Sequence, residues 1–238
     1  MKPKQLLDGP QAPIGQMLSV YRHHLGNSVG ALQITLQVLM ENLARWDDTK
    51  IRTYLARLDT ITKEQGHLLG ALKAYALESG TPEPIAAYQI WGQLTAMARG
   101  AAEGQALVLS LGQPPPEVWV WADLLALESI WRHLITNACE AMAGKREPVL
   151  DIKAVLDGAS LVFALVDNGM GIDRECLSKA PLPLFTTRKG KNGMGLAVVT
   201  KLVRELTGQF EMDSVADQGT QVRVRLRVVS GHSSGESL

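Results

Sequence analysis

The sequence predicts an α+β fold in which an N-terminal helical hairpin is followed by an α/β sandwich domain with a mixed sheet. Two adjoining segments repeat apolar residues at every seventh position, which is typical of packed helices. The two prolines of residues 79–84 end that pattern. Helical and strand-like segments alternate beyond this break, and a turn at Asp157 and Gly158 joins two of the strands, which indicates antiparallel pairing.

Length and charge limit how the chain is organised. With 238 residues and 46% hydrophobic content, it is large enough for two modest domains that each have a core. We predict the hairpin over residues 1–80, the second domain over 85–229 and a disordered tail over 230–238. Because 24 basic residues balance 24 acidic ones, no global field favours nucleic acid or an anionic membrane as a partner.

The cysteines and the apolar segments bear on the location of the chain. Cys139 and Cys176 form no Cys-x-x-Cys motif, which argues against a disulfide framework or a zinc site. The N-terminus lacks the features of a signal peptide, and no segment approaches the roughly 20 apolar residues of a spanning helix. We therefore expect a cytoplasmic chain that makes no membrane contact itself.

Two long helices make up the predicted hairpin, one from about Gln16 to Arg45 and one from about Lys50 to Glu78. Residues 46–49 offer side-chain caps for the second helix. Such a hairpin cannot bury both flanks of its seam, so we predict that two copies pair as a homodimer with a four-helix bundle. The seven-residue rows are Leu18, Leu25, Leu32 and Leu39 with Val29, Leu36 and Leu43 in the first helix, and Ile51, Leu58, Gln65 and Leu72 with Leu55, Thr62, Leu69 and Ala76 in the second.

The second domain is predicted to alternate helices and short strands. A segment rich in glycine, proline and lysine interrupts it at residues 181–195. The expected helices cover residues 85–104, 124–143 and 196–206, and the expected strands cover 106–111, 118–121, 149–156, 161–167, 209–215 and 220–228.

One polar cluster lies on the helix that begins near Leu124. His133, Asn137 and Glu140 stand at positions i, i+4 and i+7, which places them on one helical face. Such a face can bind a ligand, although a solvated surface face shows the same pattern.

A second polar cluster follows the strand that ends at Val166. Asp167 comes next, and Gly169 and Gly171 allow the backbone to turn tightly. A carboxylate there can accept a hydrogen bond from an adenine amino group, and glycines let a flat base approach the main chain. A plain surface turn is the alternative interpretation.

A third cluster, residues 188–195, is basic and rich in glycine and opens the helix at Leu196. Backbone amides at a helix N-terminus can hold phosphate, especially beside lysines. A flexible basic loop is the alternative.

The order and spacing of the three clusters resemble the histidine kinase branch of the GHKL ATPases. This resemblance extends over nearly the whole chain. Residues 133–142 resemble the family's N box, 167–171 its first glycine box, 183–187 its F box and 192–196 its second glycine box.

The resemblance implies a domain that binds ATP with Mg²⁺. Asn137 would bind the metal, Asp167 would recognise adenine, and glycines would line the triphosphate. Lys191 comes directly before residues 192–196 and stands where the family's second glycine box usually begins with glycine, so it departs from the pattern. The implied nucleotide-binding set is His133, Asn137, Glu140, Asp167, Gly169, Gly171, Phe185, Lys189, Gly193, Gly195 and Thr220.

In the hairpin, residues 22–32 resemble the family's H box when His23 is the phosphoacceptor. His23 falls opposite the leucine seam, where an imidazole can reach solvent and an incoming γ-phosphate. His24 stands where the family has Glu or Asp, whose carboxylate accepts the imidazole proton. Asn27 lies one turn beyond His23, at the position that orients water against a regulator's phosphoaspartate in the family.

This resemblance implies a two-component histidine kinase that autophosphorylates His23 and passes the phosphoryl group to an aspartate of a response-regulator receiver domain. Because His24 replaces an acid, a phosphatase or phosphotransfer protein with regulatory nucleotide binding stays open as an alternative. A non-enzymatic dimeric scaffold is another. An ATPase of the topoisomerase or chaperone branch is the last, and it would usually carry a carboxylate in place of His133.

Overall fold

The chain forms two compact units, and each is described by itself. One unit holds the N-terminal hairpin together with residues 182–194, and the other holds the α/β domain. At some helical positions, His24 among them, only the backbone is described. The computed structural model describes residues 14–76, 80–103, 106–188, 191 and 193–230.

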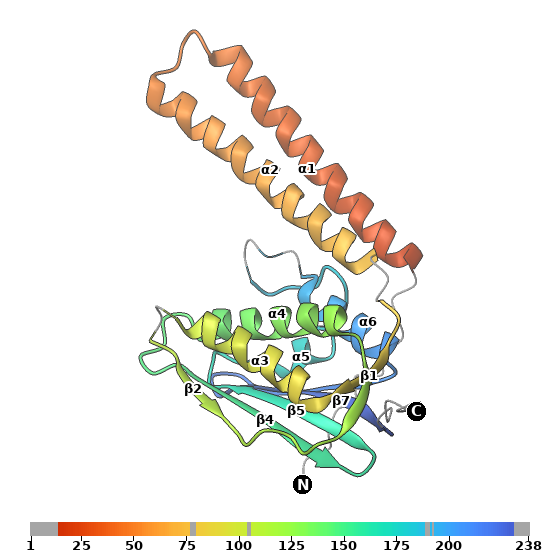
Figure 1. Cartoon of the computed structure of the whole chain (residues 1–238). Coiled ribbons are helices and arrows are strands. Elements are labelled where there is room, and N and C mark those ends of the chain that lie inside the picture. Colours follow the sequence, from red (N-terminus) through yellow and green to blue (C-terminus); the bar gives the residue numbers. More distant parts are fainter. Residues whose placement is uncertain (1–13, 77–79, 104–105, 189–190, 192, 231–238) are drawn as a thin grey trace, which may run out of the picture. The chain divides into compact units, whose positions relative to one another are not determined.

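Helices α1 (Ile14–Asn42) and α2 (Asp48–Ala76) form the hairpin, coloured red to orange in Figure 1. The predicted helix boundaries agree with the observed ones to within a few residues. The Asp47 carboxylate accepts a hydrogen bond from the Lys50 backbone N–H at 2.8 Å, which caps the first turn of α2. The Trp46 and Tyr54 rings lie 4.6 Å apart across the same turn, and they hold the loop against α2.

Along the interior of the hairpin, Thr35 and Leu39 are buried. The Thr35 hydroxyl donates to the Ala31 carbonyl at 2.6 Å, so its burial leaves the hydroxyl satisfied. Gln65 of α2 donates across to the Ser28 hydroxyl at 2.7 Å, which fixes the register of the two helices. Members of the seven-residue rows that remain 37 to 55% exposed are Leu25, Val29, Leu36, Leu43, Leu55 and Leu69.

A seven-stranded sheet forms one layer of the α/β domain. Its order is β1-β3-β7-β5-β4-β2, and β6 pairs separately with β7. Only β2 and β4 are paired in parallel among the described strands, so the predicted mixed sheet is confirmed. The strands are β1 (Glu83–Ala86), β2 (Val108–Leu111), β3 (Trp119–Ala122), β4 (Val149–Asp157), β5 (Ser160–Asp167), β6 (Gln209–Val215) and β7 (Gly219–Val229).

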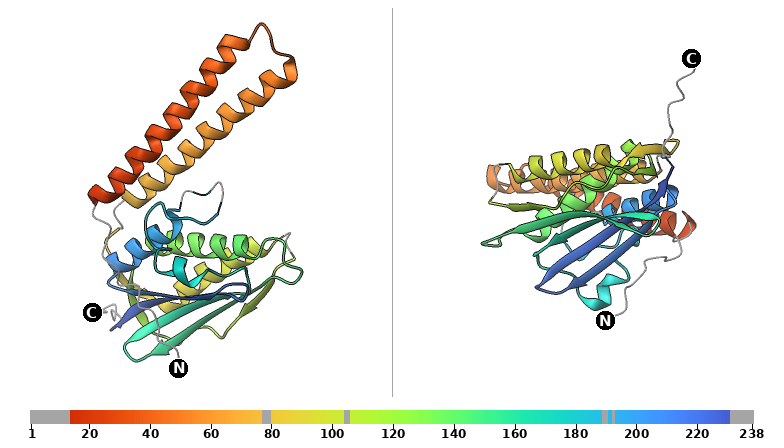
Figure 2. Two further views of the ribbon diagram at one scale, coloured as in Figure 1. Left: turned by 180° about the vertical axis from the view of Figure 1, so that it is seen from behind. Right: turned by 60° about the horizontal axis from the view of Figure 1, so that its bottom comes forward.

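Helices lie on one face of this sheet, as Figure 2 shows, and the core fills the space between the two layers. Trp131 of α4 is fully buried, and its ring centre lies 5.4 Å from that of Phe163 on β5. Within the described part of the chain, no helix has the length and apolar character needed to cross a membrane. The helices are α3 (Ala87–Ala102), α4 (Leu124–Ala141), α5 (Arg174–Leu177) and α6 (Gly195–Glu205).

Two elements differ from the expectation. The helix expected from Ile85 begins only at Ala87, because Ile85 and Ala86 extend a strand that pairs with β3. Pro84 favours an extended residue before it, which suits that strand. The short helix α5 was not expected, since four residues are too few for a periodic pattern.

Candidate functional site

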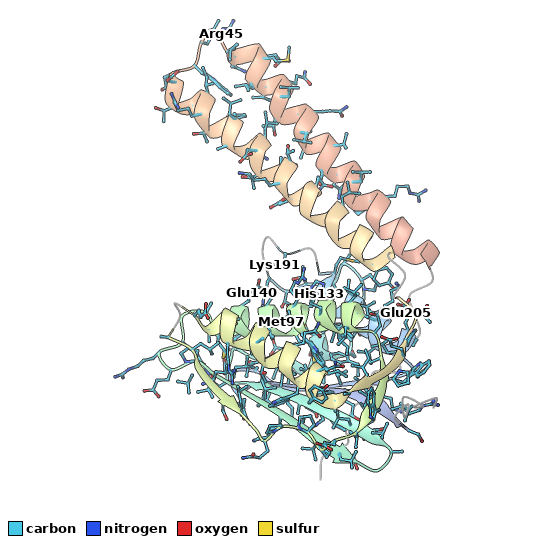
Figure 3. The ribbon with its side chains drawn as sticks, viewed as in Figure 1. Arg45, Met97, His133, Glu140, Lys191 and Glu205 are labelled. Carbon is cyan, nitrogen blue, oxygen red and sulfur yellow. The ribbon has the colours of Figure 1, made fainter. Side chains whose placement is uncertain are left out.

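Helix α4 presents a polar face beside its buried one. The Asp123 carboxylate accepts a hydrogen bond from the Leu125 N–H at 2.9 Å and so caps the helix. Figure 3 labels His133 and Glu140 on this helix. His133, Asn137 and Glu140 are all half-buried, which agrees with their predicted position on one face of the helix. The opposite face enters the core through Leu127, Ile130, Trp131, Leu134, Ile135 and Ala138.

The first residue of α6 lies against this polar face. A Cβ atom placed on Gly195 would be 3.4 Å from His133 Nδ1 and 3.7 to 3.8 Å from the two carboxamide atoms of Asn137. The absence of a side chain therefore leaves room for both groups at the N-terminus of α6. Helix N-termini carry partial positive charge, so this corner suits a phosphate group, and an amide oxygen beside phosphate suits Mg²⁺.

Asp167 ends strand β5 and is 9% exposed. One of its carboxylate oxygens accepts the Gly169 backbone N–H at 2.8 Å, which closes the turn. In the sheet register Asp167 faces Leu150 on β4 and Thr220 on β7. The fold thus brings Thr220 next to Asp167, although the two residues are far apart in sequence.

The two glycines after Asp167 are required by close backbone contacts. A Cβ on Gly169 would come within 2.7 Å of the Ala141 carbonyl group, and the Met170 N–H donates to that carbonyl at 2.9 Å. Gly171 has φ +65°, and a Cβ there would lie 2.0 Å from the Val215 carbonyl oxygen. The sequence interpretation gave these glycines a role in base approach. Their contacts show that they also dock the turn on α4 and on the β6–β7 hairpin.

Asn168 is a residue that the sequence interpretation missed. Its side-chain oxygen accepts the Val149 N–H at 3.0 Å, and its side-chain nitrogen donates to the Glu147 carbonyl at 2.8 Å. The Lys145 ammonium also donates to the Asn168 carbonyl. Asn168 thereby ties the turn that carries Asp167 to the segment between α4 and β4. Its position directly after Asp167 in the sequence could have indicated that Asn168 helps to hold this turn.

Ser214 is a second missed residue. Its hydroxyl lies 2.9 Å from the Thr220 hydroxyl and accepts the Ile172 N–H at 2.8 Å. It also donates to the Gly219 carbonyl at 3.0 Å. This network fastens the loop after Gly171 to the start of β7. No local motif marks Ser214, since its partners come from two other segments.

Phe185 and Gly193 belong to the unit that contains the hairpin. Gly193 has φ +64°, and a Cβ on it would be 2.5 Å from the Phe185 carbonyl oxygen. The F box and the second glycine box therefore contact each other through backbone at a glycine. Lys189 and Asn192 lie outside the described residues.

His23 is exposed on α1, and Asn27 is its neighbour one turn along. Asn27 Nδ2 lies 3.2 Å from His23 Nε2, within hydrogen-bond distance. A hollow of about 450 Å³ lies beside Asn27. Its lining includes Gly30 and Ile34 of α1 and Arg57 of α2. The side chain of His24 lies outside the described residues.

Burial controls the protonation of two groups on α4. The pKa of His133 is lowered, first by burial of the ring and then by the positive charge of Arg132. The pKa of the Cys139 thiol is raised chiefly by burial, with further contributions from Glu140 and Asp167. At neutral pH the site therefore has a neutral imidazole and a protonated thiol next to the buried Asp167.

Comparison with known proteins agrees with this arrangement. Residues 122–230 match the family described as histidine kinase-, DNA gyrase B- and HSP90-like ATPases. This match runs from the end of β3 through β7 and so covers most of the α/β domain. The matched residues include α4, the Asp167 turn and the start of α6, so the candidate site lies within the part of the chain that resembles these ATPases.

Relatives of the chain are sensor proteins. The C4-dicarboxylate transport sensor protein DctB of Pseudomonas aeruginosa is 28% identical over 225 residues, which cover 92% of this chain and 36% of that protein. The two-component sensor PprA of the same organism is 27% identical over 230 residues, covering 91% of this chain and 24% of that protein. The chain thus spans about a third or less of these relatives, and the predicted resemblance to sensor histidine kinases is confirmed.

Solved structures share the fold of the chain. The histidine kinase AdeS of Acinetobacter baumannii superposes with a TM-score of 0.52 at 19% identity, covering 87% of this chain and 98% of that one. Full-length ShkA in complex with AMPPNP gives a TM-score of 0.57 at 15% identity, covering 91% of this chain and 47% of that one. At these identities the likeness concerns the fold alone. Because it covers 87% and 91% of this chain, it extends beyond the α/β domain into the helical hairpin.

Proposed function

We propose that this chain is the catalytic core of a two-component histidine kinase, which autophosphorylates His23 with ATP and passes the phosphoryl group to a receiver-domain aspartate. The observation that carries the proposal is the meeting of His133 and Asn137 with the first residue of α6, in a domain of the histidine kinase-like ATPase family. The sensor relatives support the signalling role.

In this proposal the nucleotide is held at two places in the ATPase domain. The buried Asp167 carboxylate accepts a hydrogen bond from the adenine amino group. The N-terminus of α6 faces the phosphates, and Asn137 supplies an oxygen to Mg²⁺, which offsets phosphate charge when bound. By resemblance to the family, the set is completed by His133, Glu140, Gly169, Gly171, Phe185, Lys189, Gly193 and Thr220.

The chemical step requires an unprotonated nitrogen on His23. That nitrogen attacks the γ-phosphorus, the bond to the β–γ bridging oxygen breaks, and ADP leaves. The imidazole proton passes to a base, for which His24 occupies the family's position. The phosphoryl group then moves from His23 to a carboxylate oxygen of the receiver domain, and the histidine is restored.

The exposed apolar rows of the hairpin support a homodimer. Leu25, Val29, Leu36 and Leu43 follow one side of α1, and Leu55 and Leu69 extend the apolar surface to α2. Pairing with a second hairpin would remove these side chains from water at about 25 cal/mol per Å² of apolar area. A Leu36→Glu variant is expected to run as a monomer in size-exclusion chromatography with light scattering.

Labelling with γ-³²P ATP and Mg²⁺ tests the kinase proposal. We expect the protein to acquire a label that is acid-labile and base-stable, and His23→Ala to lose it. His67→Ala is the control, because it removes a histidine from α2 and should keep the label. Absence of label on the wild type, or full label on His23→Ala, would overturn the proposal.

Nucleotide binding can be tested separately with Asp167→Asn. This substitution keeps an oxygen for the Gly169 N–H but replaces the charged acceptor, so affinity for ATP should fall roughly 10- to 100-fold. Isothermal titration with AMPPNP measures this change. If neither protein binds AMPPNP, the non-enzymatic scaffold becomes the better proposal.

A phosphatase or phosphotransfer role is the second candidate, and two observations favour it. His24 replaces the acid that would accept the proton, and Asn27 contacts His23 directly. Weak self-labelling together with rapid, Asn27-dependent dephosphorylation of a phosphorylated receiver domain would support this role over the kinase.

A further inference from the structure

We propose that His133 is a metal ligand of the nucleotide site, and that it makes the site prefer first-row transition ions such as Mn²⁺ and Co²⁺ over Mg²⁺. This inference rests on the proposed nucleotide site and deepens it, because it concerns which cation accompanies ATP. His133, which the family resemblance includes only as one member of the nucleotide-binding set, thereby has a distinct role.

His133 and Asn137 lie close to the same backbone position. His133 Nδ1 and the Asn137 carboxamide both lie within 4 Å of a single point, the position of a Cβ on Gly195. The two residues are one turn apart on α4, so their side chains emerge on the same face. A cation bound by the Asn137 oxygen in front of Gly195 therefore has an imidazole nitrogen in its neighbourhood.

Mg²⁺ and the first-row transition ions prefer different ligands. Mg²⁺ favours oxygen donors in near-ideal octahedral geometry and binds nitrogen poorly. Imidazole is a better ligand for first-row transition ions, with affinity rising from Mn²⁺ to Co²⁺. Replacing one water or oxygen position by His133 thus strengthens binding of these ions relative to Mg²⁺.

The surroundings of His133 favour a neutral ring with a free lone pair. The ring is half-buried, and no described carboxylate forms an ion pair with it. On α4, Arg132 is adjacent to His133 in sequence and Glu140 lies two turns further on the same face, and the Arg132 guanidinium pairs with Glu128 one turn away. That pairing offsets the positive charge that would otherwise oppose a cation.

Binding of AMPPNP to the full chain, with Mg²⁺, Mn²⁺ or Co²⁺ as the only divalent ion, provides the first test. In the wild type we expect affinity to rise along this series, by roughly tenfold from Mg²⁺ to Co²⁺. In His133→Asn the differences between the three affinities should become much smaller, because the imidazole is gone and an oxygen donor takes its place. Arg132→Gln is the matched control on the adjacent residue, and it should keep the rising series.

Pulsed electron paramagnetic resonance of the Mn²⁺–AMPPNP complex provides a readout that is independent of affinity. A directly bound imidazole should give a ¹⁴N coupling that changes on labelling with ¹⁵N-histidine and disappears in His133→Asn. Lack of this coupling in a wild-type complex, or an unchanged metal series in His133→Asn, would overturn the inference while leaving the nucleotide site intact. Failure of the wild type to bind AMPPNP with any of the three ions would overturn both proposals.

Discussion

Asn27 Nδ2 lies 3.2 Å from Nε2 of His23, one helical turn away on the exposed side of α1. A carboxamide at this distance can orient the imidazole, and it can also hold a water molecule once a partner covers the face. The hollow beside Asn27, which Gly30 and Arg57 also line, offers a surface for such a partner. In the proposed function, this pair would serve both the phosphorylation of His23 and the dephosphorylation of a receiver domain.

Replacing Asn27 by alanine should reduce dephosphorylation of a phosphorylated receiver domain by about 100-fold, because one polar group that positions the attacking water is lost. We expect self-labelling of His23 to fall much less, so the ratio of the two rates is the diagnostic quantity. Gln33→Ala, on the exposed surface of α1, serves as the control. Equal losses in both rates would contradict a water-orienting role.

Replacing His24 by glutamate should increase the initial rate of self-labelling at least about tenfold. A carboxylate accepts the imidazole proton and stabilises the resulting charge, which a neutral imidazole does not. Phosphate transfer from γ-labelled ATP over a short time course measures the effect. Gln33→Glu adds a carboxylate elsewhere on α1, and a similar increase in that variant would point to general charge instead.

Replacing Asn168 by alanine should lower the free energy of unfolding of the ATPase domain by about 1–3 kcal/mol, because the Val149 N–H and the Glu147 carbonyl lose their side-chain partner. The affinity for AMPPNP should fall as well, since the Asp167 turn loses its tether. Lys145→Met removes only an exposed contact to the same residue and should cost about 0.5 kcal/mol or less. Thermal unfolding with and without AMPPNP distinguishes the two variants.

Replacing Gly171 by alanine should destabilise the domain by about 3 kcal/mol or more, because positive φ strain adds to a backbone clash with the Val215 carbonyl. Gly158→Ala is the matched control. Gly158 has φ +60° but open space around it, so strain alone should cost about 1 kcal/mol. Urea unfolding measures both, and equal effects would show that the predicted clash relaxes.

Acidification should weaken the folded state partly through His133. Its pKa is lowered on folding, so the unfolded chain binds the proton first as pH falls below about 6.5. The contribution of His133 to stability is therefore unchanged above that pH and is lost progressively below it, until the folded pKa is reached. In His133→Asn the loss of stability on going from pH 7 to pH 5 should be smaller, as followed by denaturant unfolding. The difference should be a fraction of the about 1.4 kcal/mol per pH unit of a fully coupled proton, because the ring is only half-buried. An identical pH dependence in both proteins would contradict this assignment.

Local periodicity was sufficient to predict the hairpin and the polar face of α4. Seven-residue rows predict packed helices, and the i, i+4, i+7 spacing places His133, Asn137 and Glu140 together whatever the rest of the fold does. The Asp167 turn was likewise predictable, since a buried strand followed by a carboxylate and glycines is a local pattern. Each of these features depends only on residues that are close together in the sequence.

Distant contacts decided the rest. Strand β1 exists because residues near Pro84 pair with β3, and helical patterning alone extended α3 over it. Ser214 joins the site through Thr220 and Ile172, and Gly171 is needed because Val215 approaches its backbone. The sequence by itself therefore determined which side chains could form a nucleotide site. Only the tertiary structure decided how the turn around Asp167 is held, because the atoms that hold it come from segments that are distant in sequence and meet only in the folded sheet.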